Sequence, residues 1–136
     1  MNNCLNCNTL LKKKTQKFCS IKCQKEYEYK NYITEWKAGN ISGMWGEYQI
    51  SMHIKKYLFE KYNNKCSTCG WWKTNRYTNL IPLEIEHIDG NFENNTEENL
   101  ILLCPNCHSL TSTYKGANLN HGRKNRKKYS LYKTKN

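Results

Sequence analysis

The clearest hydrophobic pattern in the chain is an alternation of apolar and polar residues over positions 83–88, which predicts a β-strand. Asp, Gly and Asn at positions 89–91 form a strong turn signal. After a polar loop, the apolar run at 99–103 predicts the returning strand, and Pro105 opens a short helix that carries His108. The pattern therefore predicts a strand, a long turn, a second strand and a helix, in that order.

Two further helices are predicted before this segment. Residues 24–38 contain neither Pro nor Gly, Ser20 is a suitable N-cap, and Gly39 is a helix stop. Apolar residues follow helical spacing in both predicted helices: Tyr29, Ile33 and Trp36 in the first, and Ile50, Ile54, Tyr57 and Leu58, with Lys61, in the second. The glycine-containing stretch at 39–48 between them predicts a linker or loop.

The composition indicates that apolar burial alone cannot stabilise the fold. A chain of 136 residues has the size of one domain. Only 38% of the residues are hydrophobic and the mean hydropathy is -0.94, which leaves little margin over the entropy of ordering the chain. The eight cysteines offer cross-links as four close pairs: Cys4 and Cys7, Cys19 and Cys23, Cys66 and Cys69, and Cys104 and Cys107.

The spacing of these pairs favours zinc over disulfides. The residues after Met1 lack the basic and then apolar run of a secretory signal peptide, so we expect a cytoplasmic protein with no membrane partner. Thiols stay reduced in the cytoplasm, and close cysteine pairs separated by a longer interval are typical of tetrathiolate zinc sites. We expect two structural Zn²⁺ ions, the first held by Cys4, Cys7, Cys19 and Cys23, and the second by Cys66, Cys69, Cys104 and Cys107.

The first of these sites joins a knuckle to the start of the first predicted helix, because Cys19 and Cys23 flank the N-cap residue Ser20. This is the treble-clef arrangement, in which the fold of a short segment depends on the metal ion. Two roles stay open for this unit: a structural scaffold, or DNA contact through the basic residues Lys12, Lys13 and Lys14.

The net charge of +11 is unevenly distributed along the chain. Residues 1–65 carry twelve Lys or Arg against five acids, residues 66–122 carry three against six, and residues 123–136 carry seven against none. Basic flanks suit DNA, whereas an acidic centre repels phosphate unless a cation lies between them, which indicates a metal-dependent active site. We expect the C-terminal segment to contact DNA, or else to be a solvated tail. Its basic residues include Arg123, Lys124, Arg126, Lys127 and Lys128.

The central segment resembles a known motif. Glu86-His87-Ile88-Asp89-Gly90-Asn91, then Glu98-Asn99-Leu100, and then Leu103-Cys104-Pro105-Asn106-Cys107-His108 are similar to the HNH motif of the zinc-ribbon HNH endonucleases common in phage genomes. The three name-giving positions are His87, Asn99 and His108. Order, spacing and both flanking cysteine pairs agree over about residues 66–116. The whole arrangement resembles free-standing phage HNH proteins of the homing type.

Chemistry gives these residues separate roles. Phosphodiester hydrolysis needs a deprotonated water, and an imidazole that is partly neutral at cytoplasmic pH makes His87 the expected general base. A divalent cation between Glu86 and His108, preferably Mg²⁺ or Mn²⁺ rather than Ni²⁺ or Zn²⁺, would polarise the phosphate and stabilise the leaving 3′ oxygen. The resemblance implies that Asn99 bridges the long turn and orients His87, and that the products carry 5′-phosphate and 3′-hydroxyl ends.

Two positions depart from the pattern of the family. Asp or His is more frequent in the family at the position of Glu86. Glu has one methylene more than Asp, so we expect Glu86 to bind the metal in a shifted geometry or through a water molecule. Ser112 stands where some members have a further histidine, so we expect only two protein ligands to the catalytic ion. Less favoured alternatives are that His108 joins the second zinc site and that Asp89 binds the metal instead of forming the turn.

Together these features predict an α+β fold: a small zinc-stapled, treble-clef-like ββα-metal (HNH) module with an N-terminal treble-clef-like zinc finger and helices. We divide the chain into the zinc finger and its helix (1–39), a linker and amphipathic helix (40–65), the nuclease module (66–117) and a basic tail (118–136). The expected function is nicking of double-stranded DNA in the cytoplasm of a phage-infected bacterium, by a monomer or a homodimer. The alternative is a non-catalytic double zinc-finger DNA-binding protein with a degenerate HNH core.

Overall fold

The structure, a computed structural model, describes residues 2–114. The tail predicted over 118–136 to contact DNA therefore lies outside the described residues. The chain divides into two compact units, one that ends at Ile41 and one that begins at Ser42, and each is described by itself. Within the described residues, no helix combines the length and the apolar character needed to cross a bilayer.

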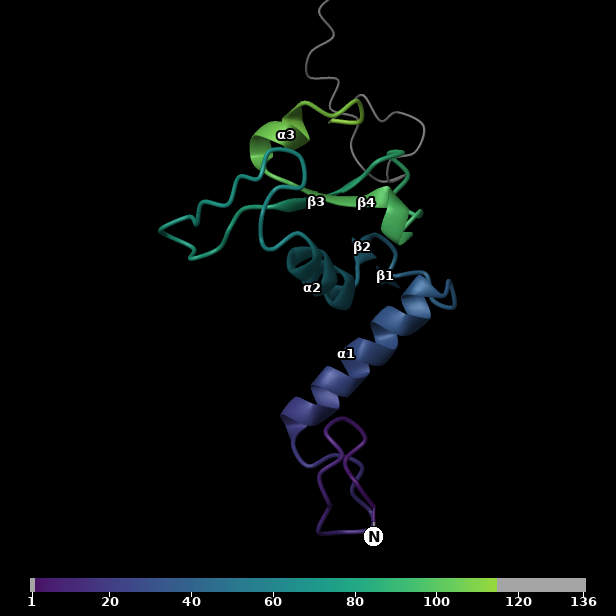
Figure 1. The fold of residues 1–136 in the computed structure, drawn as a ribbon. Coiled ribbons are helices and arrows are strands. Elements are labelled where there is room, and N and C mark those ends of the chain that lie inside the picture. The colour runs from purple at the N-terminus through teal and green to yellow at the C-terminus, as the bar shows by residue number, and fades with distance from the viewer. Residues whose placement is uncertain (1, 115–136) are drawn as a thin grey trace, which may run out of the picture. The chain divides into compact units, whose positions relative to one another are not determined.

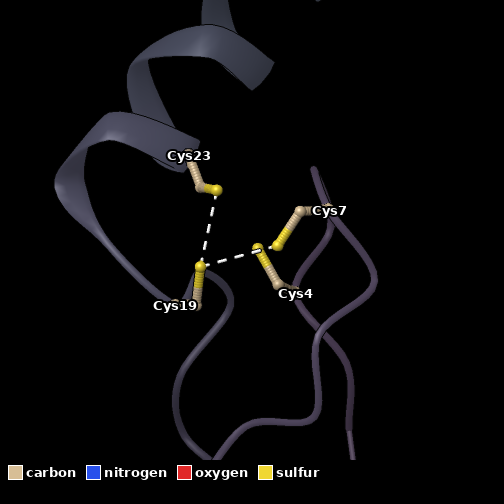
Figure 2. Close-up of side chains that lie close together, drawn as sticks. All are labelled: Cys4, Cys7, Cys19 and Cys23. Atoms are coloured by element: carbon tan, nitrogen blue, oxygen red, sulfur yellow. Dashed lines mark hydrogen bonds between the residues drawn. The ribbon is translucent and has the colours of Figure 1, made fainter.

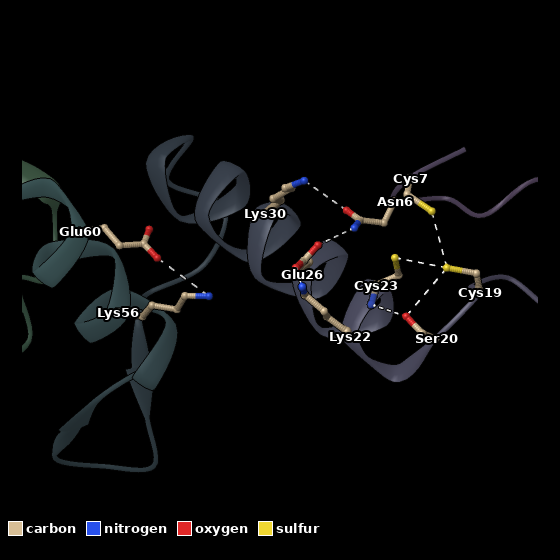
Figure 3. A network of polar contacts seen from close by, with 10 residues as sticks. All are labelled: Asn6, Cys7, Cys19, Ser20, Lys22, Cys23, Glu26, Lys30, Lys56 and Glu60. Carbon is tan, nitrogen blue, oxygen red and sulfur yellow. Dashed lines mark hydrogen bonds and ion pairs between the residues drawn. The ribbon is translucent and has the colours of Figure 1, made fainter. Parts of the chain in front are cut away.

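The first unit is a cysteine-containing loop followed by one long helix, α1 (Ile21–Lys37). Figure 3 shows how polar side chains tie the loop to the helix. Asn6 donates a hydrogen bond of 2.8 Å from its amide nitrogen to Glu26 and accepts one of 3.2 Å from the Lys30 ammonium group. A single loop residue thus contacts two successive turns of α1.

Helix α1 begins and ends where the sequence predicts. Ser20 has extended backbone, and its hydroxyl accepts a 3.1 Å hydrogen bond from the backbone N–H of Cys23, as expected of an N-cap. Past the end of the helix, Gly39 has a φ of 79°, a left-handed conformation that glycine adopts without steric cost. The predicted helix and both of its boundaries are confirmed.

The second unit opens with a short hairpin that the sequence did not reveal. Strands β1 (Met44–Trp45) and β2 (Gln49–Ile50) pair in antiparallel fashion, with Met44 opposite Ile50. Gly46 has a φ of 67° in the turn between them. The prediction of a loop at these positions and the assignment of Ile50 to the following helix were wrong, because strands of two residues are too short to give a detectable period.

Helix α2 (Met52–Lys61) follows the hairpin and packs on β4 (Leu100–Leu103). Its N-cap is Ser51, whose hydroxyl accepts a 3.2 Å hydrogen bond from a backbone N–H in the first turn. Ile54 and Leu58, four residues apart and so on one face of the helix, are both 0% exposed. The amphipathic helix predicted around these two residues is confirmed.

The centre of the second unit has the predicted order of strand, turn, strand and helix. β3 (Glu84–His87) pairs in antiparallel fashion with β4, and the register sets His87 opposite Leu100. Helix α3 (Pro105–Ser109) contacts both strands. Figure 1 shows α3 on one side of this hairpin and α2 on the other. The α+β class is therefore confirmed.

A 3₁₀ helix, η1 (Glu97–Asn99), leads into β4 and is tied to α2. The Tyr57 hydroxyl donates a 2.6 Å hydrogen bond to Glu97, and the Lys61 ammonium group lies 3.2 Å from the same carboxylate oxygen. Both partners belong to α2. The helix therefore fixes the end of the long turn between β3 and β4.

The core of the second unit includes two of its cysteines. Leu102 and Leu103 of β4 pack there with side chains from the segments on either side. The buried members of this core are Cys66, Leu83, Leu102, Leu103 and Cys104, and partly buried side chains packed against them include Phe59, Tyr62, Trp71, Ile81 and Ile85. The second cysteine cluster is consequently continuous with the hydrophobic core.

Replacing Leu102 tests this packing. Leu102 is 0% exposed, so Leu102→Ala should leave a cavity and lower the free energy of unfolding by about 2–5 kcal/mol. Urea denaturation of the zinc-loaded protein measures the change. Leu110→Ala is the control, because Leu110 is 83% exposed and its loss should cost no more than about 0.5 kcal/mol. Equal stability of the two variants would contradict the described core.

Candidate metal centres and active site

Four cysteine sulfurs converge at each of two places. Cys4, Cys7, Cys19 and Cys23 form the first cluster (Figure 2), and Cys66, Cys69, Cys104 and Cys107 form the second. Within each cluster the sulfurs lie within 4.8 Å of one another, with individual separations of 3.4, 3.6 and 3.7 Å. A disulfide bond is about 2.05 Å long, whereas sulfurs placed tetrahedrally around zinc at about 2.3 Å are about 3.8 Å apart. Both clusters could therefore hold zinc.

Each cluster begins with a knuckle of the same local structure. The Cys4 carbonyl accepts a 2.9 Å hydrogen bond from the N–H of Asn8, and the Cys66 carbonyl accepts one of 2.9 Å from Gly70. Asn8 and Gly70, which follow the second cysteine of each knuckle, have φ values of 61° and 77°. Asn and Gly are the residues that best tolerate this conformation, so the same turn directs both pairs of sulfurs.

Each cluster is completed at the start of a helix. Cys23 lies in the first turn of α1, and Cys107 lies in the first turn of α3. At α3 the N-cap is Cys104 itself, whose sulfur accepts a 3.5 Å hydrogen bond from the Cys107 N–H. The knuckle and helix start predicted for the first cluster are thus present in both.

The thiol pKa values show why these donor sets suit a cation. Burial raises the pKa of Cys4 and of Cys66, but backbone hydrogen bonds at the knuckles outweigh it and lower each pKa to about 6. Contacts with neighbouring thiols raise the pKa of Cys19 and of Cys107 to about 12. Each cluster thus contains both thiols with a lowered pKa and thiols with a raised pKa. A bound dication would favour the thiolate form of all four by neutralising the accumulated charge.

The predicted ligands of the catalytic ion lie together. Glu86 and Glu84 are two residues apart on β3, so their side chains share the face that meets α3. There the His108 Nδ1 atom lies 2.7 Å from Glu86 Oε2, and Nε2 lies 3.2 Å from Glu84 Oε2. The other Glu86 oxygen accepts a 2.6 Å hydrogen bond from the Thr113 hydroxyl.

The Glu86–His108 pair fits a divalent cation. The His108 Nδ1 atom is buried and, although it lies close to the carboxylate, the two atoms do not meet in hydrogen-bond geometry. A carboxylate oxygen and an unsatisfied imidazole nitrogen that converge in this way are a suitable donor set for Mg²⁺ or Mn²⁺. His108 is held by the two carboxylates, whereas the second cluster has four sulfurs of its own.

His87 has a different partner. Its Nε2 atom lies 2.7 Å from the side-chain oxygen of Asn95, which is 3% exposed. An amide oxygen only accepts hydrogen bonds, so Nε2 is the donor in this contact, and in a neutral imidazole the lone pair is then on Nδ1. Sequence reasoning missed Asn95, because it is one of several asparagines in a polar loop and nothing in the sequence distinguishes it from the others.

Asn99 holds the turn between the strands together. Its side-chain oxygen accepts a 3.0 Å hydrogen bond from the Asp89 N–H, and its amide nitrogen lies 2.8 Å from both the Asp89 carboxylate and the Asn94 carbonyl. Burial raises the pKa of Asp89, but hydrogen bonds from Asn94, from the Asn91 backbone and from Asn99 outweigh it and lower the pKa below its usual value. Asp89 thus takes part in the turn as a carboxylate.

The structure brings together some of the predicted site residues and leaves others apart. Glu86 and His108 are in contact, whereas none of the described hydrogen bonds or ion pairs joins His87 to either of them. Asn99 contacts the turn and not the His87 ring. In the first unit, the three lysines considered for DNA contact are all exposed: Lys12, Lys13 and Lys14.

A comparison with curated proteins identifies a relative. The chain is 52% identical over 58 residues to the H-N-H endonuclease F-TflIV of Escherichia phage T5. A segment of this chain is therefore similar to part of a phage HNH endonuclease. The matched segment covers 41% of this chain and 24% of the phage protein, so the chain spans about a quarter of that relative. The chain matches no protein-family model, and no solved structure matches it.

Zinc content tests the two candidate metal centres. We expect two zinc ions per purified chain, and one ion after either Cys7→Ser or Cys69→Ser, because each change removes one thiolate from a different cluster. Both residues are exposed, so the loss of packing is small. Atomic absorption measures the stoichiometry. Two ions retained in both variants, or none in the parent protein, would contradict the assignment.

Proposed function

We propose that this chain is a metal-dependent HNH endonuclease of phage or homing type that nicks double-stranded DNA. The observation that carries the proposal is the contact between Glu86 and His108 on one face of the β3–β4 hairpin. His87 follows Glu86 directly on β3. The phage T5 relative is named an endonuclease, which supports DNA as the substrate. An infected bacterial cytoplasm would be the place of action.

His87 is the proposed general base. Because Nε2 donates to Asn95, the free lone pair on Nδ1 can take a proton from a water molecule that attacks phosphorus. Asn95 is 3% exposed, so its amide is held by its surroundings and limits rotation of the imidazole. Asn95 is therefore a positioning residue in this proposal.

Glu86 and His108 would hold a divalent cation through Oε2 and Nδ1. When bound, such an ion supplies neutralisation of the phosphoryl charge and stabilisation of the leaving 3′ oxygen. Thr113 donates to the other oxygen of Glu86 and so limits rotation of the carboxylate. The Glu84 carboxylate lies 3.2 Å from Nε2 of His108, which favours a proton on Nε2 and leaves Nδ1 as the ligand atom. The chain thus provides two ligands and a partner that orients each of them.

The substrate phosphate would lie at the end of β3. Successive residues of a strand point to opposite faces, so Glu86 and His87 leave β3 on opposite sides. Strand β3 ends at His87, and a phosphate at this end can approach both side chains. Asn99 holds the turn that follows this end, which makes it a positioning residue for the site. One such site per chain cuts one strand, and a double-strand break needs two events.

Basic residues outside the site complete the proposal. Lys12, Lys13 and Lys14 of the first unit, together with the basic C-terminal tail, would neutralise phosphates along the bound DNA. Zinc would occupy the two cysteine clusters as a structural ion. A monomer or a homodimer satisfies this scheme equally.

Supercoiled plasmid tests the activity. The parent protein with Mg²⁺ or Mn²⁺ should convert supercoiled DNA to the open circular form, and His87→Ala should lower the rate by about 10²–10⁴-fold because it removes the base. Gel electrophoresis separates the two forms. Glu47→Ala is a control, since Glu47 is exposed and lies outside the site. Equal relaxation by the parent and by His87→Ala, or relaxation by neither, would contradict the proposal. Relaxation by neither would favour a DNA-binding protein without catalysis.

Asn95 gives a second, finer test. Asn95→Ala should slow nicking about tenfold or more, because the imidazole is no longer oriented. The loss should stay smaller than the decrease of about 10²–10⁴-fold that removal of the base itself causes. Asn95→Asp keeps an acceptor and adds negative charge, which favours the imidazolium form of His87. The acid limb of the pH–rate profile should then move to higher pH. An unchanged profile in an active Asn95→Asp protein would show that this amide does not contact the base.

A further inference from the structure

A loop of residues 71–82 projects from the second unit between the second knuckle and β3 (Figure 1). Its turn is built around Asn75. The Asn75 N–H donates 2.8 Å to the Leu80 carbonyl, and the Asn75 carbonyl accepts 2.8 Å from the Asn79 N–H. The Asn75 side-chain oxygen also accepts from the N–H groups of Tyr77 and Thr78, at 2.8 and 3.2 Å. The loop therefore has a defined shape before any partner binds.

This preformed loop displays aromatic and apolar side chains to solvent. Trp72 is 60% exposed, Leu80 67% and Tyr77 80%. The guanidinium of Arg76 lies 4.8 Å from the centre of the Tyr77 ring and donates a 2.6 Å hydrogen bond to its hydroxyl. Neighbouring Trp71 packs against the core instead. The loop therefore presents a cation stacked on an aromatic ring. This arrangement suits contact with a polyanion that also has flat apolar surfaces, such as nucleic acid bases.

The distribution of charge points to the kind of partner. Between residues 66 and 114 the chain has six acids and two basic residues, and both basic residues, Lys73 and Arg76, lie in this loop. The acids lie in β3, in the turn and in η1. DNA that approaches this acidic region would be repelled everywhere in the described part of the segment except at the loop. Within residues 66–114, the loop is therefore the part whose charge attracts an acidic partner such as DNA.

We propose that the loop of residues 71–82 is a DNA-contacting element of the nuclease module, with Lys73 and Arg76 on phosphates and Tyr77 against the sugar or base surface. The inference rests on the proposed function, because it takes double-stranded DNA as the substrate. The loop leads into the first residue of β3, and His87 ends this strand. Four strand residues span about 13 Å, which is about four base pairs along a duplex. A duplex held at His87 that runs along β3 therefore reaches the base of the loop within about four to five base pairs.

The test measures DNA affinity against salt in the full zinc-loaded chain, with His87→Ala in every protein so that the DNA stays intact. A fluorescent duplex of random sequence is titrated at 50 to 200 mM salt, by anisotropy. Lys73→Gln with Arg76→Gln should weaken binding and reduce the slope of log K against log salt by up to about 1.8, because each lost phosphate contact removes about 0.9. Tyr77→Ala should weaken binding several-fold, and Tyr77→Phe, which keeps the ring, should not.

A matched control distinguishes this loop from general basic charge. Lys55→Gln with Lys56→Gln removes the same charge from exposed positions on α2 and should leave the slope closer to that of the parent. Equal losses in both double variants, or no loss in the loop variant, would overturn the proposal. So would a Tyr77-dependent doubling of mass in light scattering, which would assign the loop to a second copy of the chain.

Failure of the loop and failure of the proposed function have different signatures. If the parent protein nicks plasmid but the loop variants bind duplex normally, the nuclease stands and the loop assignment is wrong. If binding depends on the loop but the parent protein never nicks, the DNA contact stands and the catalytic proposal is wrong.

Discussion

The placement of His108 depends on the second cysteine cluster. Cys104 caps α3 and Cys107 lies in its first turn, immediately before His108. The knuckle at Cys66 holds this turn against the core, since Cys66 and Cys104 are buried with Leu102 and Leu103. A helix of five residues has little stability of its own. Without the cluster, only side-chain contacts such as the ion pairs with Glu84 and Glu86 would hold the imidazole of this short helix near the strand.

The site is built from two networks that are joined by the backbone of β3. On one face, Glu84 and Glu86 hold His108. At the end of the strand, His87 contacts Asn95, and the turn that carries Asn95 is closed by Asn99. Because His108 is held by Glu84 and Glu86 whereas His87 is held by Asn95, a change in one network should mainly affect the proposed metal site or the proposed base. A phosphate between them would be the first group to contact both.

Sequence reasoning succeeded where local chemistry determines the structure. Ser20 and Gly39 set the ends of α1, and alternation set β3, because caps and strand periods are properties of neighbouring residues. It also placed Glu86 and His108 in one site, which the structure brings into contact. It did not find the β1–β2 hairpin, because two-residue strands have no period.

The residues that contact the site residues could not be predicted from the sequence, for a different reason. Asn95 was hidden among similar residues of the turn, and Glu84 and Thr113 become relevant only because the hairpin register and α3 bring them to His108 and Glu86. The motif identifies which residues carry the chemistry. The residues that orient them come from tertiary contacts, and in this chain they are an amide, a carboxylate and a hydroxyl at positions with no local signature.

The two units use the same cysteine arrangement for unequal purposes. In the first unit the buried apolar side chains are Cys4, Leu11 and Trp36, so the 17-residue helix α1 has little core to pack against. A helix of that length is marginal alone, and polar contacts at its surface add little. Its fold should therefore depend strongly on the cysteine cluster, which could hold a metal ion. The second unit has Ile54, Leu58 and Leu102 fully buried, so apolar packing contributes much of its stability. The main role of its cysteine cluster is to fix the position of His108.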